Sequence, residues 1–465
     1  MKQTLSFYVM AVFYAVIAFA KATVASLNGK LFDYQARFGM VLGANEFNKQ
    51  EKVAFEDILQ GFEDALVLSK NVRIKSFGSD AEAERSGDVI WRPQPYIAQS
   101  FDGTDQTANF KSSTQLSVPA RLGYEKSSPW LMNSKELRDA LQENRLGEAA
   151  KQKLASDINV AVMNVCSNQG TLVVKRTTAA AGFDDVAQAE AIFNEQGVQG
   201  YDRYMALSTR DYNGMASNLA SRATMTGKPV TAYEKAYVGT VSSFETYKLD
   251  YAKRLAAAAG GAGITINTLV AGANYYTPRA TSVGANGERS NVDNRFQTVT
   301  VSSTASVVAG DAFTIATANA VHHVTKGDTG QLKTFRVISV DSATTMTICP
   351  PIISAQGGTD AEAQYQNVTI GTPAANSALV WLNTTAGNIN PFWQKDAIEL
   401  MPGRYAVPTD AGTAVMRATT EQGIELVWQK SYDIKTMQTL YRLDTTFGVT
   451  NLQPEMSGIM LFSQA

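Results

Sequence analysis

The chain has 465 residues and a nearly balanced charge, with 41 lysines and arginines against 43 aspartates and glutamates. Its length predicts about three domains at roughly 150 residues each, and its charge argues against a surface that binds nucleic acid or an anionic membrane over its whole extent. Two adjacent histidines and two distant cysteines argue against separated histidine triads and zinc sites, and exclude a disulfide-rich scaffold.

The first residues form an uncharged apolar run at positions 5–20, between Lys2 and Lys21. Such a run is typical of a secretory signal peptide, and it is short for a membrane span. It is also consistent with an apolar helix that packs on a partner subunit. In a third interpretation, translation starts at Met40 and the first 39 residues are an over-long start. The residues themselves leave these three possibilities open.

Residues 50–69 carry apolar side chains at helical spacing, with acidic side chains largely on the other side. The apolar positions are Phe55, Ile58, Leu59, Phe62 and Leu66. This pattern predicts an amphipathic helix. Residues 72–87 are polar, with mixed charge and two glycines, which predicts a loop or an arm.

Residues 88–130 contain two extended segments, at 89–91 and 116–122, which flank a polar, turn-rich stretch at 101–107. We predict a long two-stranded β-loop, with Trp91 in its first strand and Asp102 and Asp105 in the turn-rich stretch. An isolated two-stranded ribbon is only marginally stable in water. A long β-loop therefore implies a second surface on which it lies.

Residues 133–220 alternate between helices and strands. Asn133 and Glu136 have the spacing of a capping box, and Gly147 is expected to interrupt the helical pattern that follows. The other expected elements are a helix at 148–168 capped by Gly170, a strand at 171–174, a helix at 186–196 stopped by Gly197, a strand at 204–207, and a helix at 211–220 capped by Ser208 or Thr209.

A composition shift begins at residues 256–263, which read AAAAGGAG. From there to about residue 383, threonine, valine and alanine alternate in short strands separated by turns. This pattern predicts a small β-barrel or sandwich of about 120 residues, inserted into an α/β chain. The glycines are interpreted as a hinge rather than a phosphate loop, because no strand precedes them and no Lys-Ser or Lys-Thr follows. Mixed strands return after residue 393.

Candidate catalytic groups are few. His322 and His323 would point to opposite faces of a strand, which favours a structural role over metal binding. Cys166 lies on an apolar helix face and is interpreted as a core residue. Asp184 and Asp185 are best explained by capping of the following helix. We therefore predict no catalytic residue, no metal site and no cofactor.

The predicted arm, β-loop, long helix, split α/β core and inserted β domain share one property. Extended arms and ribbons gain stability only when they lie on neighbouring surfaces. Their combination therefore predicts a subunit of a large assembly, in which contacts between copies close into shells or extend into tubes.

The decapeptide at residues 291–300, NVDNRFQTVT, closely resembles a stretch in the inserted domain of the coat proteins of short-tailed phages of the P-twenty-two type. Weaker similarities to the same family follow in the same order along the chain. They lie at residues 40–46, 89–93, 170–174, 392–398 and 447–455. The resemblance thus runs from about residue 40 to the end, and the chain departs from the family pattern in its first 39 residues.

The resemblance implies the HK97-like phage capsid fold, an α+β fold with an N-arm, an E-loop, a spine helix, P and A domains and an inserted, β-barrel-like I-domain. It also implies hexamers and pentamers in an icosahedral head around packaged double-stranded DNA. A scaffolding protein and a portal protein would assist assembly in the host cytoplasm, away from any membrane. The DNA contact would be weak and non-specific, and binding of a decoration protein is left open.

The resemblance also divides the chain. The expected parts are an extension at 1–39, an N-arm at 40–87 with Phe55, Ile58 and Phe62 on its helix, the E-loop at 88–130, the P-domain with the spine helix at 131–184, the first part of the A-domain at 185–258, the I-domain at 259–385 and returning strands at 386–465. No pattern for lysine–asparagine crosslinks is recognisable, which predicts non-covalent shells.

In this family the I-domain carries a D-loop that contacts a neighbour across a two-fold axis. The corresponding segment is about 278–291, so the resemblance implies that Arg279, Glu288 and Arg289 form contacts between subunits. A solvated loop is an equally good interpretation of each of these residues taken singly. The alternative to a coat protein is a secreted or cell-surface β-rich binding protein, which the apolar N-terminal run suggests.

Overall fold

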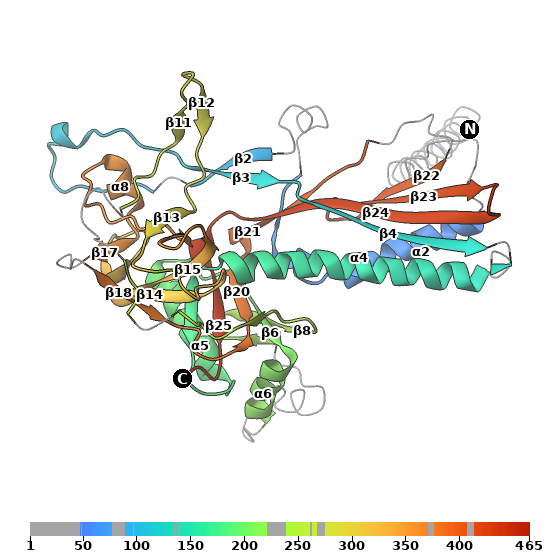
Figure 1. Ribbon diagram of the computed structural model, residues 1–465, viewed down its shortest axis with the longest axis horizontal. Coiled ribbons are helices and arrows are strands. Elements are labelled where there is room, and N and C mark those ends of the chain that lie inside the picture. Colours follow the sequence, from blue (N-terminus) through green and yellow to red (C-terminus); the bar gives the residue numbers. More distant parts are fainter. Residues whose placement is uncertain are drawn as a thin grey trace, which may run out of the picture. The chain divides into compact units, whose positions relative to one another are not determined.

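The computed structural model describes part of the chain in two compact units (Figure 1). The described residues are 47, 49–76, 89–95, 97–133, 135–136, 140–220, 239–260, 263–266, 275–370, 376–406 and 413–465. Unit 1 holds the described residues up to Ala65, with Tyr124–Ser156 and Pro402–Phe447. Unit 2 holds Leu66–Gly123, Asp157–Met401 and Gly448–Ala465. The expectations for residues 1–39 lie outside the described residues.

Unit 1 is an antiparallel sheet with helices beside it. The strand order is β4 (Tyr124–Asn133), β24 (Gln438–Asn451, to residue 447 in this unit), β23 (Glu425–Asp433) and β22 (Ala414–Thr419). Helix α2 (Lys49–Ala65) confirms the predicted amphipathic helix, and Phe55, Ile58 and Phe62 are buried within the unit.

Aromatic side chains form the centre of unit 1. The Trp428 ring lies 5.8 Å from Phe55, 6.3 Å from Trp130 and 5.9 Å from Tyr441 between ring centroids. Trp130 and Tyr441 lie on the neighbouring strands β4 and β24, and their rings stack with 5.6 Å between centroids. Such aromatic pairs add to the stability that burial of their area provides. The apolar face of α2 therefore packs in the core of its own subunit.

Helix α4 (Ala140–Gln169) is continuous, which corrects the expected break at Gly147. A side chain at Gly147 would place its Cβ 2.7 Å from the Ile58 side chain of α2. The glycine thus permits close approach of the two helices rather than ending one of them. The expected capping box before α4 is confirmed, because Asn133 Oδ1 accepts the Glu136 N–H at 2.9 Å and Glu136 Oε2 accepts the Asn133 N–H at 3.0 Å.

The first half of unit 2 is a six-stranded mixed sheet. Its strands, in spatial order, are β5 (Leu172–Lys175), β25 (Ser457–Leu461), β20 (Asn390–Gln394), β6 (Arg203–Ser208), β8 (Phe244–Leu249) and β7 (Thr240–Val241). Helices α5 (Phe183–Gln196) and α6 (Thr209–Ala220) contribute to its core, where Phe193, Phe244 and Phe392 meet. The predicted strands and helices of this region are confirmed.

The ends of these elements follow the predicted capping chemistry. Gly197 has a φ of 80° and ends α5. Asp185 is fully buried, and its Oδ2 accepts the N–H groups of Ala181 and Gly182 at 2.6 and 3.2 Å. Ser208 Oγ accepts the Asp211 N–H at 3.3 Å at the start of α6. Both aspartate and serine therefore satisfy amide groups that a helix start leaves free.

The second half of unit 2 is a β-barrel, which confirms the predicted β-rich insertion. Its strands run in the order β10 (Thr265–Ile266), β18 (Ser377–Trp381), β14 (Ala312–Val321), β15 (Asp328–Val340), β16 (Thr345–Cys349) and β13 (Gln297–Thr300), with β17 (Val368–Ile370) paired to β14. A bridge between Ile266 and Val301 joins the two ends of this sheet. Apolar side chains such as Phe313, Phe335 and Ile348 fill the interior.

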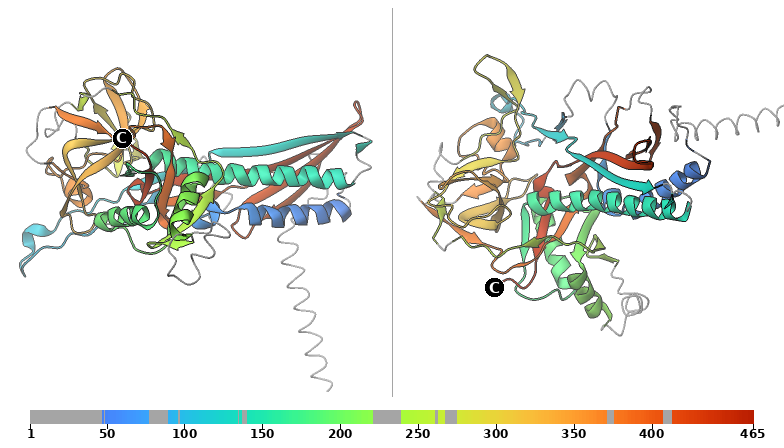
Figure 2. Two further views of the ribbon diagram at one scale, coloured as in Figure 1. Left: turned by 90° about the horizontal axis from the view of Figure 1, so that it is seen from below. Right: turned by 45° about the vertical axis from the view of Figure 1, so that its right-hand side comes forward.

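Two shorter pairings frame the barrel. Strands β9 (Arg254–Leu255) and β19 (Gly387–Asn388) pair where the chain enters and leaves it. A hairpin of β11 (Thr281–Val283) and β12 (Arg289–Asn291) projects from it, as Figures 1 and 2 show. A short helix, α8 (Asp360–Tyr365), lies between β16 and β17 in the sequence.

The expected long β-loop also belongs to unit 2. Strand β2 (Val89–Pro93) pairs with β3 (Ser117–Arg121), which confirms the two-stranded base, and a short 3-10 helix, η2 (Thr107–Asn109), lies between them. Residues 124–130, predicted as part of the same loop, pair instead with β24 of unit 1. Strand β1 (Arg73–Ile74) lies in the expected loop at 72–87 and pairs with β21 (Ile398–Pro402).

The remaining short elements are the 3-10 helices η1 (Leu68–Asn71), η4 (Lys395–Ala397) and η5 (Pro454–Met456). Among the described residues, no helix combines the length and the apolar character that crossing a membrane requires.

Candidate assembly surfaces

The β11–β12 hairpin presents two of the predicted contact residues. Ser282 pairs with Ser290, and their hydroxyl oxygens lie 3.0 Å apart. The Gly284 N–H donates to the Glu288 carbonyl at 2.8 Å and closes the tip. Glu288 and Arg289 are exposed beside this tip. The hairpin is therefore a narrow two-stranded projection whose charged side chains face solvent in the single chain.

The base of the hairpin is held by Asn294, a residue of the decapeptide that we did not single out from the sequence. Its buried amide donates to the Arg279 carbonyl at 2.9 Å and accepts the Arg279 N–H at 3.0 Å. Tyr276 donates its hydroxyl to the same amide oxygen at 2.9 Å. The structure thus places the exposed Arg279 at the base, apart from Glu288 and Arg289 at the tip.

The predicted β-loop residues have different surroundings. Trp91 is half-buried in β2, opposite Pro119. Asp102 is exposed, and its carbonyl accepts the Gln106 amide at 3.2 Å. Asp105 accepts the hydroxyl and the N–H of Thr107 at 2.6 and 3.1 Å, and these hydrogen bonds lower its pKa. Asp105 therefore shapes the loop locally.

Exposed apolar side chains mark two surfaces that sequence reasoning missed. In the β-loop, Phe110 is 89% exposed and Phe101 is 46% exposed. At the turn from β23 to β24 in unit 1, Ile434 is 83% exposed and Met437 is 60% exposed. Large apolar side chains are unfavourable in water, and groups of them mark contact sites. The signal in the sequence was an aromatic or aliphatic residue within a polar turn.

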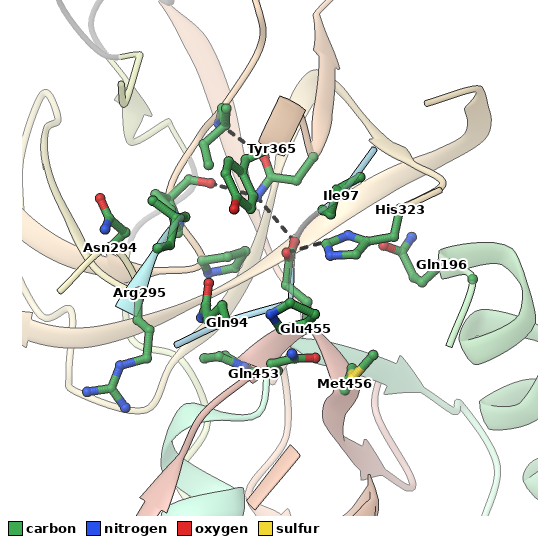
Figure 3. Close-up of a pocket in the computed structure, with 18 of the residues that line it drawn as sticks. Gln94, Ile97, Gln196, Asn294, Arg295, His323, Tyr365, Gln453, Glu455 and Met456 are labelled. Atoms are coloured by element: carbon green, nitrogen blue, oxygen red, sulfur yellow. Dashed lines mark hydrogen bonds and ion pairs between the residues drawn. The ribbon is translucent and has the colours of Figure 1, made fainter. Parts of the chain in front are cut away.

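A cavity of about 130 Å³ lies in unit 2 where the β-loop, the barrel and the η5 segment meet (Figure 3). Glu455 of η5 reaches Lys333 of the barrel at 2.6 Å, and His323 at 4.0 Å. Burial would raise the pKa of Glu455, but Lys333, His323 and hydrogen bonds lower it to about 2. Burial lowers the pKa of His323 and brings that of Lys326 to about 8.

This charged group ties the barrel to the returning chain. Lys333 is almost fully buried and also donates to Gln196 Oε1 at 3.2 Å, and Asn367 donates to Glu455 at 3.2 Å. Because each buried polar group has a partner, the arrangement is suited to holding segments together.

The other candidate groups have structural surroundings. His322 Nδ1 accepts the N–H groups of Val324 and Thr325 at 3.2 and 3.1 Å. Cys166 is fully buried in the core, where burial raises the pKa of its thiol. Within the described part of the chain, no three His, Cys, Asp or Glu side chains are grouped as a metal ion would require.

The family described as P22 coat protein, gene protein 5, matches residues 43–463. The chain belongs to the P22 coat protein family. As a P22-family coat protein it is a major capsid protein of a phage head, and its place is the virion. This membership confirms the expected α+β, HK97-like capsid fold with an inserted β domain, and it gives no support to a secreted binding protein.

Solved structures similar to this coat protein include a chain of Mycobacterium phage Che8, with 10% identity, a TM-score of 0.42, and coverage of 86% of this chain and 92% of that one. The capsid structure of the cyanophage P-SCSP1u has 9% identity, a TM-score of 0.41, and coverage of 86% and 89%. The CUS-3 coat protein I-domain has 36% identity over 27% of this chain and 98% of that one, with a TM-score of 0.20.

Proposed function

We propose that this coat protein assembles as hexamers and pentamers into an icosahedral head around double-stranded DNA, and that it acts without catalytic chemistry. A scaffolding protein and a portal protein are its expected assembly partners, and the DNA contact is weak and non-specific. The single observation that carries this proposal is the family match over residues 43–463.

The proposed division of the chain follows the family. An N-arm spans 40–87, an E-loop 88–123, a P-domain with β4 and the spine helix 124–184, an A-domain 185–258 and an I-domain 259–385, with returning strands at 386–465. The exposed aromatic side chains of the β-loop and the projecting hairpin support roles for these parts in contacts between copies.

The β11–β12 hairpin is proposed as the D-loop that meets a second copy across a two-fold axis. Its tip carries charges of both signs on adjacent residues, Glu288 and Arg289. In a two-fold contact the same patch faces itself, so Glu288 of each copy can meet Arg289 of the other. Arg279 at the base of the hairpin is proposed as a further contact.

The test of the head-forming function is electron microscopy with sedimentation of the purified protein, made with and without its scaffolding protein. We expect closed shells or tubes tens of nanometres across. A small monodisperse species in the presence of scaffolding protein would contradict the proposal.

The D-loop assignment predicts that Arg289→Ala weakens shell assembly and leaves monomer stability nearly unchanged, because an exposed side chain contributes little to the fold. Sedimentation measures the yield of shells, and chemical denaturation measures stability. Arg145→Ala, at an exposed position of α4, is the matched control. Normal shell yield in Arg289→Ala would remove the hairpin from the proposed contacts.

A further inference from the structure

The long β-loop is bonded to helix α8 of its own chain around Thr114, and Lys111 of the loop forms an ion pair of 3.0 Å with Asp360 at the start of that helix. Gln364 of α8 accepts the Thr114 N–H at 3.1 Å through its amide oxygen. Tyr365, the next residue, donates its hydroxyl to the Thr114 carbonyl at 2.8 Å. Gln364 also donates to the Ser113 hydroxyl at 3.4 Å. Two adjacent barrel side chains thus bind both backbone groups of one loop residue.

The part of the barrel that binds the loop is itself firmly anchored. Gln364 and Tyr365 are 5% and 7% exposed, so their orientation is set by packing. Thr359 caps α8 by accepting the Glu362 N–H, and the buried Glu362 carboxylate accepts the Thr277 hydroxyl. The helix therefore offers a fixed pair of polar groups rather than a mobile surface.

The same junction between loop and barrel contains both an apolar cluster and a cavity. Leu116 and Ile97 of the loop pack with Tyr365 and Ile353 of the barrel. The cavity of about 130 Å³ is also lined by Ile97, Leu116 and Tyr365 (Figure 3). A cavity means that packing between loop and barrel is incomplete there, so displacing the loop costs less than it would from a filled interface.

We propose that α8 is a clasp, formed by Gln364 and Tyr365, that holds the β-loop of the same subunit at Thr114 and can release it. The loop beyond the clasp is exposed, including Phe101 and Phe110. The clasp therefore sets the direction in which these aromatic side chains are presented before a second copy covers them. Release breaks the hydrogen bonds of Gln364 and Tyr365, separates the exposed Lys111–Asp360 ion pair and uncovers the Leu116 contact, at a junction that already contains a void.

The first test uses amide hydrogen exchange on the full-length, unassembled chain. The clasp predicts that the Thr114 amide exchanges at least about tenfold more slowly than the amides of residues 102–104, because its N–H is held by a buried acceptor. Equal exchange at the two places would overturn the proposal without the need for any variant.

The second test is the double variant Gln364→Leu with Tyr365→Phe, which removes the polar groups and keeps the apolar contacts. We expect about tenfold faster cleavage after Phe110 by chymotrypsin and after Lys111 by trypsin, with faster exchange at Thr114. Ser282→Ala, which alters the barrel's hairpin away from α8, is the control and should leave both rates unchanged.

Unchanged cleavage and exchange in a double variant that melts like the parent would overturn the clasp. Both readouts come from the unassembled chain and do not depend on shell formation. The clasp and the head-forming function can therefore fail separately.

Discussion

At the scale of single residues, Arg336 is a charged side chain whose burial is offset by several hydrogen bonds. It is fully buried in unit 2 and donates to the carbonyls of Ser167, Gly170 and Gly310 at 2.9–3.3 Å. Burial lowers its pKa to about 10. The first two carbonyls belong to the end of α4, where unpaired carbonyl groups and the helix dipole favour a positive charge. Arg336 of the barrel therefore completes a helix that belongs to another part of the chain.

We predict that Arg336→Met lowers the free energy of unfolding by about 3 kcal/mol, because it leaves two or three buried carbonyls without a donor at about 1–3 kcal/mol each. Arg336→Lys should recover part of the loss, since it keeps the charge but makes fewer bonds. Urea denaturation measures both variants.

The control for Arg336 is Arg279→Met, which removes an exposed arginine from the same domain and should change stability by less than about 0.5 kcal/mol. A loss in Arg336→Met no larger than that of the control would contradict the capping role.

At the scale of elements, glycines mark the points where backbones come closest. Gly147 lets α2 and α4 approach within unit 1. In unit 2, a Cβ on Gly448 of β24 would lie 2.0 Å from the Arg121 carbonyl oxygen at the end of β3. The neighbour of Gly448 is backbone, which cannot move aside as a flexible side chain can. The end of the β-loop is therefore set directly against β24.

We predict that Gly448→Ala destabilises the protein by at least about 3 kcal/mol or prevents folding, because overpacking against backbone forces the strands apart. Gly123→Ala is the matched control, since nothing lies within 4 Å of the added Cβ. Thermal unfolding of the two variants makes the comparison. Equal melting temperatures would show that β24 and the loop can separate without cost.

The elements also show what can be predicted from residues alone. Local signals such as the helical spacing of Phe55, Ile58 and Phe62 predicted α2, and the Asn133–Glu136 spacing predicted the capping box before α4. The continuity of α4 through Gly147 was missed, because it depends on a helix about 90 residues away in the sequence. The pairing of residues 124–130 with β24 depends on a strand more than 300 residues later.

The candidate site was less predictable than the fold. The position of Arg279, Glu288 and Arg289 on an exposed hairpin followed from the family resemblance, and their contacts remain predictions. The binding of Thr114 by Gln364 and Tyr365 depends on geometry between distant segments, for which two polar residues on a short helix give no sequence signal.

At the scale of the whole molecule, the subunit presents several surfaces that a neighbour would cover. The β-loop carries Phe110, the hairpin carries Arg289, and the turn of unit 1 carries Ile434 and Met437. The first two lie on two-stranded projections, and the third lies at a turn at the end of the sheet of unit 1. This distribution suits a coat protein, because contacts made at several separate projections can build a closed shell.

We predict that Ile434→Asp lowers the yield of shells at least tenfold, because it places a charge where an apolar contact between copies is expected. Stability of the monomer should change by less than about 0.5 kcal/mol, since Ile434 is 83% exposed. Sedimentation of assembly reactions measures the yield, with Lys435→Ser at the same turn as the control. Full assembly of Ile434→Asp would exclude this turn from the contacts.

The paired strands β9 and β19 bring the two ends of the barrel insertion side by side, with Leu255 opposite Gly387 and Arg254 opposite Asn388. Such opposed residues lie about 5 Å apart, a gap that a tight turn of two residues can close. In topological terms the barrel is an insertion with adjacent ends, so another domain with the same spacing between its ends can replace it without stretching the host chain. The replacement domain would also need a donor in the place of Arg336, because the carbonyl groups at the C-terminal end of α4 accept hydrogen bonds from this barrel residue. A domain that matches only the end spacing would leave those carbonyl groups without a donor.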